Sequence, residues 1–517
     1  MRRALLLLCL SASAFAQSPQ TLTVDASHVL GPHTQTPLNT IGAGRANEGL
    51  RADWQAQLST VQREIGFHYI RFHGILHDDM GVYTEDAHGN PIYNFQYVDT
   101  LYDALLARHL RPFVELSFMP TALASGPQTV FWWKGNITPP KDITKWNDLI
   151  RAFVTHLQSR YGADEVNQWY FEVWNEPDLH NGFFTGSQSD YFDLYRNTVE
   201  AIRSVCTKCR VGGPATAVGW EADWLTFIAK NHVAADFLST HTYGVVKGSF
   251  DSAGEDNTVL DTSPNSIIGR VRGSRDRIDH SAIPHLELHY TEWSSSYTPS
   301  DYIHDQYIEA SFILEKLRAT SPLAQSMSYW TFTDIFEEGG PPKRPFHGGF
   351  GLINLQGIRK PAYFAYKFLA QLGPTDIATT DTAHSWATTK PDGSVQILFW
   401  NYTAVAPPSN SSDQIFYKLE QPAQPTPSTN LVVDHIANGR YHLHIYRTGY
   451  QQNDAYTAYL HLGSPANLSP AQVETLNNSA NGSPTESRDL TITTGHFNES
   501  VPMHQNDTVL ITLDPIH

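Results

Sequence analysis

Short apolar runs and helix-like stretches alternate from residue 40 to about residue 370, and this alternation limits the folds open to the chain. The strand-like runs lie at residues 40–46, 69–75, 112–118, 169–175, 211–215, 237–243, 286–292 and 326–331. The stretches between them repeat apolar residues at the i, i+3 and i+4 spacing of a helix that covers a sheet. Because eight strand–helix units are the number that closes a (β/α)8 barrel, we expect a TIM barrel over residues 40–370.

The pattern changes after residue 370. Strand-like runs near residues 394–400, 441–446, 490–494 and 509–513 are separated by segments rich in Pro, Ser, Asn and Gly. Such runs are typical of antiparallel sheets. We expect residues 371–517 to form a C-terminal antiparallel β-sandwich domain, and residues 17–39 to form an N-terminal segment whose run 21–24 adds a strand to it.

The first sixteen residues have the three parts of a secretory signal peptide. Arg2 and Arg3 form a basic start, an apolar run follows over residues 4–10, and residues 14–16 form an A-x-A cleavage site. The apolar run is too short to cross a bilayer. We therefore expect residues 1–16, with Cys9, to be removed, and the mature protein to be exported to the periplasm or the extracellular space.

Charge and composition exclude several classes of partner. The chain has 35 Lys and Arg residues against 52 Asp and Glu residues, a net charge of −17, which excludes a nucleic-acid binder that works through a basic face. No later stretch of 18 apolar residues occurs, so no membrane partner is expected. Cys206 and Cys209 are either a local disulfide or two inert thiols, because a zinc site would need a second pair.

Polar and aromatic residues gather where the predicted barrel strands end, which is where barrel enzymes place their active sites. The fourth strand leads into the run WYFEVWNEPD at residues 169–178. Alternation points Glu172 and Trp174 into the barrel, and Pro177 ends the ladder and leaves Glu176 at the rim. A carboxyl group beside indole rings is partly desolvated, so its pKa rises and it suits a general acid. The alternative is a solvated carboxylate at a strand end.

This run matches, position by position, the signature W-x-F-E-x-W-N-E-P-D of glycoside hydrolase family 39. From about residue 40 to the C-terminus the chain resembles the bacterial β-xylosidases of that family. The matching motifs include RFHG at 71–74, HTY at 241–243, TEW at 291–293, WTF at 330–332 and DIFEE at 334–338. The resemblance implies a retaining glycosidase, which needs two carboxyl groups about 5 to 5.5 Å apart.

The resemblance also assigns roles to individual residues. It implies that Glu176 is the catalytic acid/base and that Glu292 is the nucleophile. Asn175 is expected to donate to the sugar 2-hydroxyl, an interaction that strengthens in the transition state. Arg71 is expected either to orient Glu292 and keep it ionised or to neutralise the interior Glu172.

The remaining matched residues are expected to hold the sugar. Tyr243 is expected to donate to the nucleophile, and Trp330 to form an apolar floor under the sugar. Glu337 and Glu338 either accept bonds from sugar hydroxyls or belong to a solvated acidic loop. The expected substrate-binding set is His73, Gly74, Phe118, Asn175, Phe184, His241, Tyr243, Trp330, Glu337 and Glu338.

Neither a metal nor another cofactor is expected. His285 and His289 lie within one predicted strand, where the rise of about 3.3 Å per residue separates them too far for one ion. His442 and His444 share a strand face without an evident third ligand. A double displacement by two carboxyl groups requires no cofactor.

The expected function is release of β-D-xylose from the non-reducing ends of xylo-oligosaccharides or aryl xylosides. A loop that carries Glu337 and Glu338 disfavours an anionic sugar, and bulky side chains at Phe118, Trp330 and Phe336 would discourage a hydroxymethyl group. The alternatives are an arabinosidase or another glycosidase of the same family and, in a different class, a non-catalytic carbohydrate-binding protein. The presence of both expected catalytic carboxylates favours an enzyme.

Overall fold

The structure is a computed structural model that describes residues 20–248 and 257–516. The predicted signal peptide, residues 1–16, lies outside the described residues. None of the helices in the described ranges is long and apolar enough to cross a membrane.

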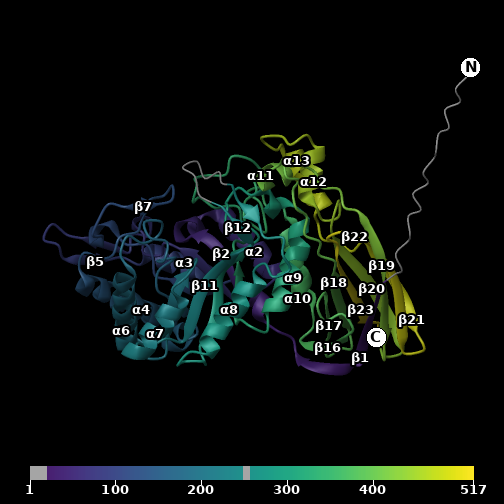
Figure 1. Ribbon diagram of the computed structural model, residues 1–517, viewed down its shortest axis with the longest axis horizontal. Helices are drawn as coiled ribbons and strands as arrows, with labels where there is room; N and C mark the ends of the chain where they lie inside the picture. Colours follow the sequence, from purple (N-terminus) through teal and green to yellow (C-terminus); the bar gives the residue numbers. More distant parts are fainter. Residues whose placement is uncertain (1–19, 249–256, 517) are drawn as a thin grey trace, which may run out of the picture.

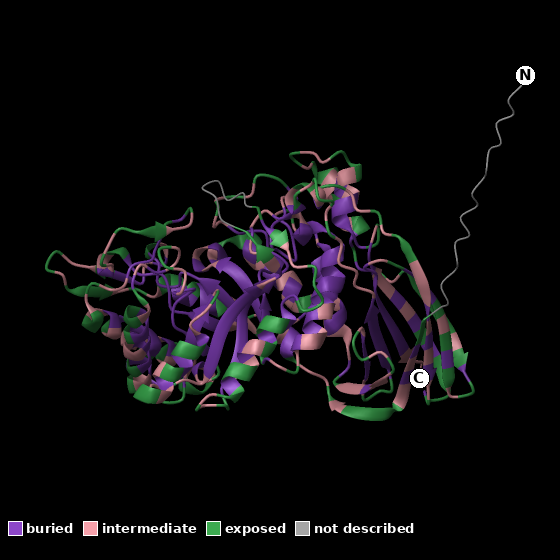
Figure 2. Cartoon of the chain, in the orientation of Figure 1, coloured by how far each residue is buried: buried purple, intermediate pink, exposed green. Residues whose placement is uncertain are grey.

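Eight parallel strands close into a barrel, which confirms the predicted fold class. The strands are β2 (Thr40–Arg45), β3 (Tyr69–His73), β6 (Arg111–Glu115), β9 (Tyr170–Glu172), β10 (Arg210–Thr216), β11 (Phe237–Tyr243), β14 (Glu287–Ser294) and β15 (Ser326–Tyr329). They follow one another around the barrel in chain order, and β15 pairs with β2 to close it. The barrel strands are buried along their length (Figure 2).

Helices pack around the barrel and follow the strands in turn (Figure 1). They are α2 (Ala52–Glu64), α3 (Gln96–Leu106), α4 (Ile143–Tyr161), α6 (Gln188–Val205), α7 (Glu221–Asn231), α8 (Ile268–Asp279), α9 (Ile308–Thr320) and α10 (Pro361–Gln371). The longest, α4, begins where the Asp142 side chain accepts from two backbone N–H groups. Its buried face repeats at helical spacing through Leu149, Phe153 and Leu157.

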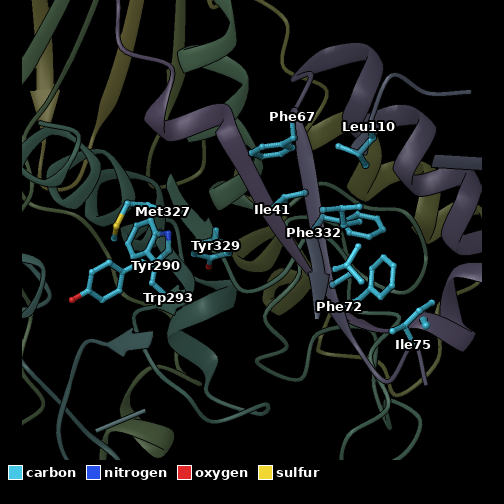
Figure 3. Close-up of a cluster of buried hydrophobic side chains, with 14 of the residues drawn as sticks. Ile41, Phe67, Phe72, Ile75, Leu110, Tyr290, Trp293, Met327, Tyr329 and Phe332 are labelled. Atoms are coloured by element: carbon cyan, nitrogen blue, oxygen red, sulfur yellow. The ribbon is translucent and has the colours of Figure 1, made fainter. Parts of the chain in front are cut away.

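Apolar side chains fill the space between the barrel strands and these helices. Tyr290 and Trp293 on β14 lie near Met327 and Tyr329 on β15, in one buried cluster (Figure 3). The Trp293 and Tyr329 rings meet edge to face with centroids 5.6 Å apart. This packing fixes the strand that carries Glu292.

Short helices and two-stranded pairs lie in the connecting loops. They are α1 (Thr36–Asn39), α5 (Ala163–Val166), α11 (Asp413–Phe416), α12 (Ala455–His461), α13 (Pro470–Ser479) and the strand pairs β4 (Tyr83–Glu85) with β5 (Pro91–Tyr93), β7 (Thr129–Val130) with β8 (Gly135–Asn136), and β12 (Val245–Lys247) with β13 (Val259–Leu260). Cys206 and Cys209 form a disulfide at the end of α6. Of the two alternatives left by the sequence, a local disulfide or two inert thiols, the structure shows the disulfide.

A nine-stranded sheet forms the other part of the chain. Its strands, in spatial order, are β21 (Glu486–Ile492), β20 (Gly439–Thr448), β23 (Thr508–Pro515), β18 (Val395–Trp400), β17 (Ser385–Thr389), β16 (Thr375–Thr379), β1 (Gln20–Pro32), β19 (Pro425–Asp434) and β22 (His496–His504). All pairs are antiparallel except β1 with β19. Leu443 on β20 shares one buried cluster with Leu22 and Val433 on β1 and β19, which lie toward the other end of this order, so the sheet wraps around its own core. The exact domain boundaries stay a prediction.

The sheet packs against the barrel through α9 and α10 (Figure 1). Phe368 on α10 contacts Tyr446 on β20, with ring centroids 6.2 Å apart. The indole N–H of Trp400 donates to Glu315 on α9 over 3.0 Å. The two helices that follow β14 and β15 thus carry the attached sheet.

A buried ion cluster lies at the start of α10. The Lys360 ammonium contacts Asp305 at 2.8 Å and Asp334 at 3.3 Å, and all three side chains are fully buried. Lys360 also donates to the backbone oxygen of Gly349 over 2.6 Å. These contacts join the loops after β14 and β15 to α10.

Replacing Lys360 with Met is expected to lower the free energy of unfolding by about 3 to 5 kcal/mol, because two buried carboxylates lose their counter-ion. The control is Lys367→Met on the same helix, whose partner Glu64 keeps a second contact with Arg359. That variant is expected to lose about 1 kcal/mol or less. Urea titrations of both variants measure the difference, and equal losses would contradict this account.

Candidate active site

Glu176 and Glu292 face each other at the C-terminal end of the barrel. Their side chains are nearly buried, with 8% and 5% of each residue exposed. A carboxylate oxygen of Glu176, a carboxylate oxygen of Glu292 and a ring nitrogen of His241 all lie within 4.8 Å of one another. This spacing fits a double displacement, since an inverting pair needs roughly 6.5 to 9.5 Å to admit a water.

The backbone before Glu176 leaves the strand conformation early. β9 ends at Glu172, three residues sooner than the sequence pattern predicts, because Trp174 and Glu176 adopt left-handed conformations with φ of 72° and 44°. Such conformations cost about 1 to 3 kcal/mol each for residues other than glycine. The Glu176 N–H donates to Ala215 on the next strand over 2.8 Å, which holds the turn in place.

Glu292 is held as an anion. Arg71 donates to one carboxylate oxygen and the Tyr243 hydroxyl to the other, both over 2.7 Å. Burial alone would raise its pKa, but the charges of His241, Arg71 and His73 outweigh burial and lower the pKa to about 2. Burial also lowers the pKa of His241 to about 4, so near pH 7 the cations that act on Glu292 are Arg71 and His73.

Glu176 has the opposite tendency. Burial raises the pKa of its carboxyl group well above the usual range, and the negative charges of Glu292 and Asp178 add to this shift. Two carboxyl groups therefore lie side by side with pKa values pushed in opposite directions. That difference is what separates a proton donor from a nucleophile.

A chain of hydrogen bonds fixes the tautomer of His241. The Thr291 hydroxyl donates to Glu172 over 2.8 Å, so its oxygen can only accept from the His241 Nε2–H at 3.1 Å. In the neutral ring Nδ1 then carries no proton. It lies 2.7 Å from Glu176 Oε1 and accepts the proton of the Glu176 carboxylic acid.

Arg71 contacts both of the partners that the sequence left open. Its fully buried guanidinium donates to Glu172 over 2.6 Å as well as to Glu292. Asn175 accepts a further bond over 2.8 Å, and Glu115 forms an ion pair at the same distance. One cation therefore orders residues from three strands and the loop after β9.

His73 carries the second buried positive charge. Burial lowers its pKa, but ion pairing and hydrogen bonding with Glu115 and the interaction with Glu338 outweigh burial and raise the pKa to about 10. Nδ1 lies 2.7 Å from Glu115 and Nε2 lies 3.4 Å from Glu338. Burial raises the pKa of Glu338 to about 7 despite this contact.

A cavity of about 530 Å³ opens above the carboxyl pair. Seven of the residues predicted from sequence line it, namely His73, Asn175, Glu176, Tyr243, Glu292, Trp330 and Glu338. His241 lies behind Glu176 and contacts it directly. The structure thus brings both expected catalytic groups and most expected sugar-binding groups to one cavity.

Four other predicted residues lie outside the cavity lining. Phe118 is fully buried between His73 and Trp174, and Phe184 packs against Trp174 at 5.5 Å. Gly74 adopts a positive φ of 71° below Trp133. Glu337 turns away and pairs with Arg45 and Arg51. These four residues therefore lie around the cavity and support the residues that line it.

Several cavity residues were not predicted from sequence. They include Leu179, Phe183, Val218, Val246, Arg270, Tyr297 and Phe350. They lie on loops, at the start of α8 or, for Val246, in the three-residue strand β12, where no strand or helix period is long enough to mark which side chain faces inward. The aromatic content of the loop after β9 is the one signal that could have suggested Phe183 beside Phe184.

The donor set could also hold a metal ion. Glu176, His241 and Glu292 offer two oxygens and a nitrogen, a set that suits zinc or copper. However, the internal hydrogen bonds already satisfy these atoms, with Tyr243 and Arg71 on Glu292 and the acid proton between Glu176 and His241. The arrangement can carry out acid/base and nucleophilic chemistry with its own residues.

Comparison with known proteins agrees with this geometry. Residues 20–496 match the model of glycosyl hydrolases family 39. A β-xylosidase of Geobacillus stearothermophilus is 37% identical over 485 residues, 92% of each chain. The crystal structure of the GH39 enzyme from Xanthomonas axonopodis pv. citri superimposes with a TM-score of 0.93 at 43% identity, covering 98% of this chain and 100% of that one. A monomeric β-xylosidase from Caulobacter crescentus CB15 gives 0.92 at 43% identity, covering 96% and 100%.

The family model spans the barrel and most of the attached sheet, and the first of these relatives matches over nearly its whole length. The chain therefore belongs to glycoside hydrolase family 39 and is a glycosidase.

Proposed function

We propose that the protein is a retaining β-xylosidase that releases β-D-xylose from the non-reducing ends of xylo-oligosaccharides or aryl xylosides. The observation that carries this proposal is the carboxyl pair within 4.8 Å whose pKa values shift in opposite directions. The β-xylosidases among the similar proteins support the choice of sugar.

In the first step, ionised Glu292 attacks the anomeric carbon while Glu176 donates its proton to the leaving oxygen. Burial keeps the Glu176 proton in place until it is needed, and Arg71 keeps Glu292 ionised. Asn175 accepts from Arg71 through its oxygen, which directs the amide nitrogen as a donor toward the sugar 2-hydroxyl. The products of this step are a glycosyl-enzyme ester and a free aglycone.

In the second step, water hydrolyses the ester. Esterification removes the charge of Glu292, and this charge is one of the causes that raise the pKa of Glu176. Glu176, which has given its proton to the leaving oxygen, is therefore more stable as a carboxylate and acts as the base that takes a proton from the attacking water. The same residue therefore serves as acid and then as base.

The cavity favours a neutral pentopyranose. Glu338 lines it and opposes a sugar carboxylate, and Trp330 offers an apolar face to the sugar ring. Phe118 and Phe336 do not line it, so the steric argument against a hydroxymethyl group rests on Trp330.

A panel of aryl glycosides tests the proposed function. The β-D-xyloside is expected to be cleaved with a kcat/KM at least about tenfold above that of the β-D-glucoside, with the α-L-arabinoside as a further comparison and no cleavage of the α-L-iduronide. A chelator is expected to leave the rate unchanged. Similar rates on xyloside and glucoside would refute the proposed sugar preference, while inactivity on every glycoside would favour a non-catalytic carbohydrate-binding protein.

Variants of the two carboxylates test the mechanism. Glu292→Gln is expected to abolish turnover with every leaving group, because no glycosyl-enzyme can form. Glu176→Ala is expected to retain glycosylation by a dinitrophenyl xyloside, whose leaving group needs no proton, and added azide is expected to restore turnover and yield a β-azide. Recovery of an α-azide from Glu176→Ala would reverse the two roles.

Thr291→Val tests whether the tautomer of His241 controls the protonation of Glu176. Without the hydroxyl, Nδ1 of His241 can carry the proton and donate to an ionised Glu176, which lowers the pKa of that carboxyl group. The basic limb of the kcat/KM profile is expected to move to lower pH, with a loss of about tenfold in rate at neutral pH.

The matched controls are Thr291→Ser, which keeps the hydroxyl, and Thr240→Val, a buried barrel threonine that bonds Thr216 and Glu221 instead. Both are expected to retain the parent pH profile. A basic limb that stays in place in Thr291→Val would show that this hydroxyl does not set the proton position.

We also propose that the protein is exported. The N-terminal sixteen residues support this with their signal-peptide pattern. The disulfide between Cys206 and Cys209 supports it independently, because disulfides persist in oxidising compartments.

A further inference from the structure

A second cavity of about 600 Å³ lies beside the catalytic one. Its walls come from residues 298–302 after β14, residues 336–347 after β15 and residues 412–418 of the C-terminal part. Phe336 forms part of its lining and packs against Trp330 and Phe350, which line the catalytic cavity, at 6.0 and 5.2 Å between ring centroids. The two cavities therefore share an aromatic wall.

The charge of this second cavity is opposite to that of the chain. Lys343, Arg344, Lys418 and His347 line it, and no Asp or Glu is found among its described lining residues, although the chain has a net charge of −17. The two lysines and the arginine are exposed, and in the described part of the chain none of the three forms an ion pair. Lys418 lies over the Tyr302 ring at 5.6 Å and Arg344 contacts the Tyr459 hydroxyl. These neutral partners leave the positive charges available to an anionic ligand.

A buried polar atom in the same wall also lacks a partner. Nδ1 of His347 is shielded from solvent and makes no hydrogen bond within the described residues. Buried polar atoms are nearly always hydrogen-bonded, so this imidazole has an unused hydrogen-bonding position. The ring would have to turn before Nδ1 could donate to a carboxylate or a hydroxyl group in the cavity.

An exposed indole lies against the loop between the two cavities. Trp132 is 58% exposed, an uncommon state for so large an apolar side chain. Its backbone N–H donates to the backbone carbonyl oxygen of Glu338 over 2.7 Å, and its ring covers Gly340, where an added Cβ would lie 3.4 Å from the indole. Glu338 lines the catalytic cavity and Gly340 the second one. An indole face in this place can stack on the C–H face of a pyranose.

We propose that Trp132 and the cation-lined cavity bind an acidic saccharide, namely the uronic acid branch of a xylo-oligosaccharide whose terminal xylose occupies the catalytic cavity. Lys343 and Arg344 hold the carboxylate, and Trp132 supports a ring of the main chain. The inference rests on the proposed function and specifies its substrate class. The carboxylate thus binds in the second cavity and not in the catalytic cavity, where Glu338 opposes a second negative charge.

The test compares a xylo-oligosaccharide that carries glucuronic acid on the leaving-group side with an unbranched one of equal length. The parent enzyme is expected to prefer the branched substrate about fivefold in kcat/KM, and salt is expected to reduce this preference by screening. In Lys343→Gln/Arg344→Gln the ratio is expected to fall to near one. Trp132→Ala is expected to lower kcat/KM on both oligosaccharides. Hydrolysis of a small aryl xyloside is expected to remain unchanged in both variants.

The control for charge is Lys208→Gln/Lys230→Gln, which removes two exposed lysines that precede β10 and β11 at the opposite end of the barrel. The control for the indole is Tyr97→Ala, which removes a 52% exposed aromatic side chain on α3. Both controls are expected to retain the parent preference. An unchanged preference in Lys343→Gln/Arg344→Gln, or no preference in the parent enzyme, would overturn the inference.

Calorimetric titration with free glucuronate separates the two possible sources of the carboxylate. Tight binding of the free acid without a preference for the branched substrate would assign the cavity to a free uronic acid and overturn the proposed branch. Failure of the parent enzyme on the aryl xyloside would instead refute the proposed function. These outcomes are therefore distinguishable.

Discussion

The buried guanidinium of Arg71 is the contact on which the site depends. It joins Glu115, Glu172 and Glu292, three carboxylates that would otherwise repel one another in a region without solvent. A buried charge without a partner costs several kcal/mol, so these groups fold together or not at all. Because Arg71 lies on β3 and its partners on β6, β9 and β14, the charge network also sets the relative position of four barrel strands.

The same network keeps a proton on Glu176. Arg71 and His73 supply two positive charges against Glu115, Glu172 and Glu292, and His73 also contacts Glu338. No further cation contacts Glu176 among the described residues, and its nearest partner, His241, is kept neutral by burial. Ionising Glu176 would add a negative charge to a set that already carries an excess, so the proton stays on this carboxyl group as long as Glu292 is ionised.

The spacing of apolar residues was sufficient to predict the barrel and the positions of residues at its strand ends. Strand alternation placed Glu172 inside the barrel and Glu176 at its rim, and both carboxylates lie there. The loops were less predictable, because an aromatic residue that faces a cavity and one that packs behind it have the same local pattern. Phe118 was expected in the cavity and instead supports His73 and Trp174, whereas Phe183, one residue before the predicted Phe184, lines it. Only tertiary packing separates these cases.

The attached sheet affects the site through the helices that follow the last two barrel strands, one of which carries Glu292. α9 and α10 come directly after β14 and β15, and they carry the contacts of Glu315 with Trp400 and of Phe368 with Tyr446. At the start of α10, Lys360 joins Asp305 to Asp334, and Asp334 lies four residues before Glu338 in the loop that separates the two cavities. Packing of the sheet therefore limits the motion of this loop, since a shift of α10 would have to break a fully buried ion cluster. The sheet thus stabilises the geometry of a site whose described lining contains none of the sheet's residues.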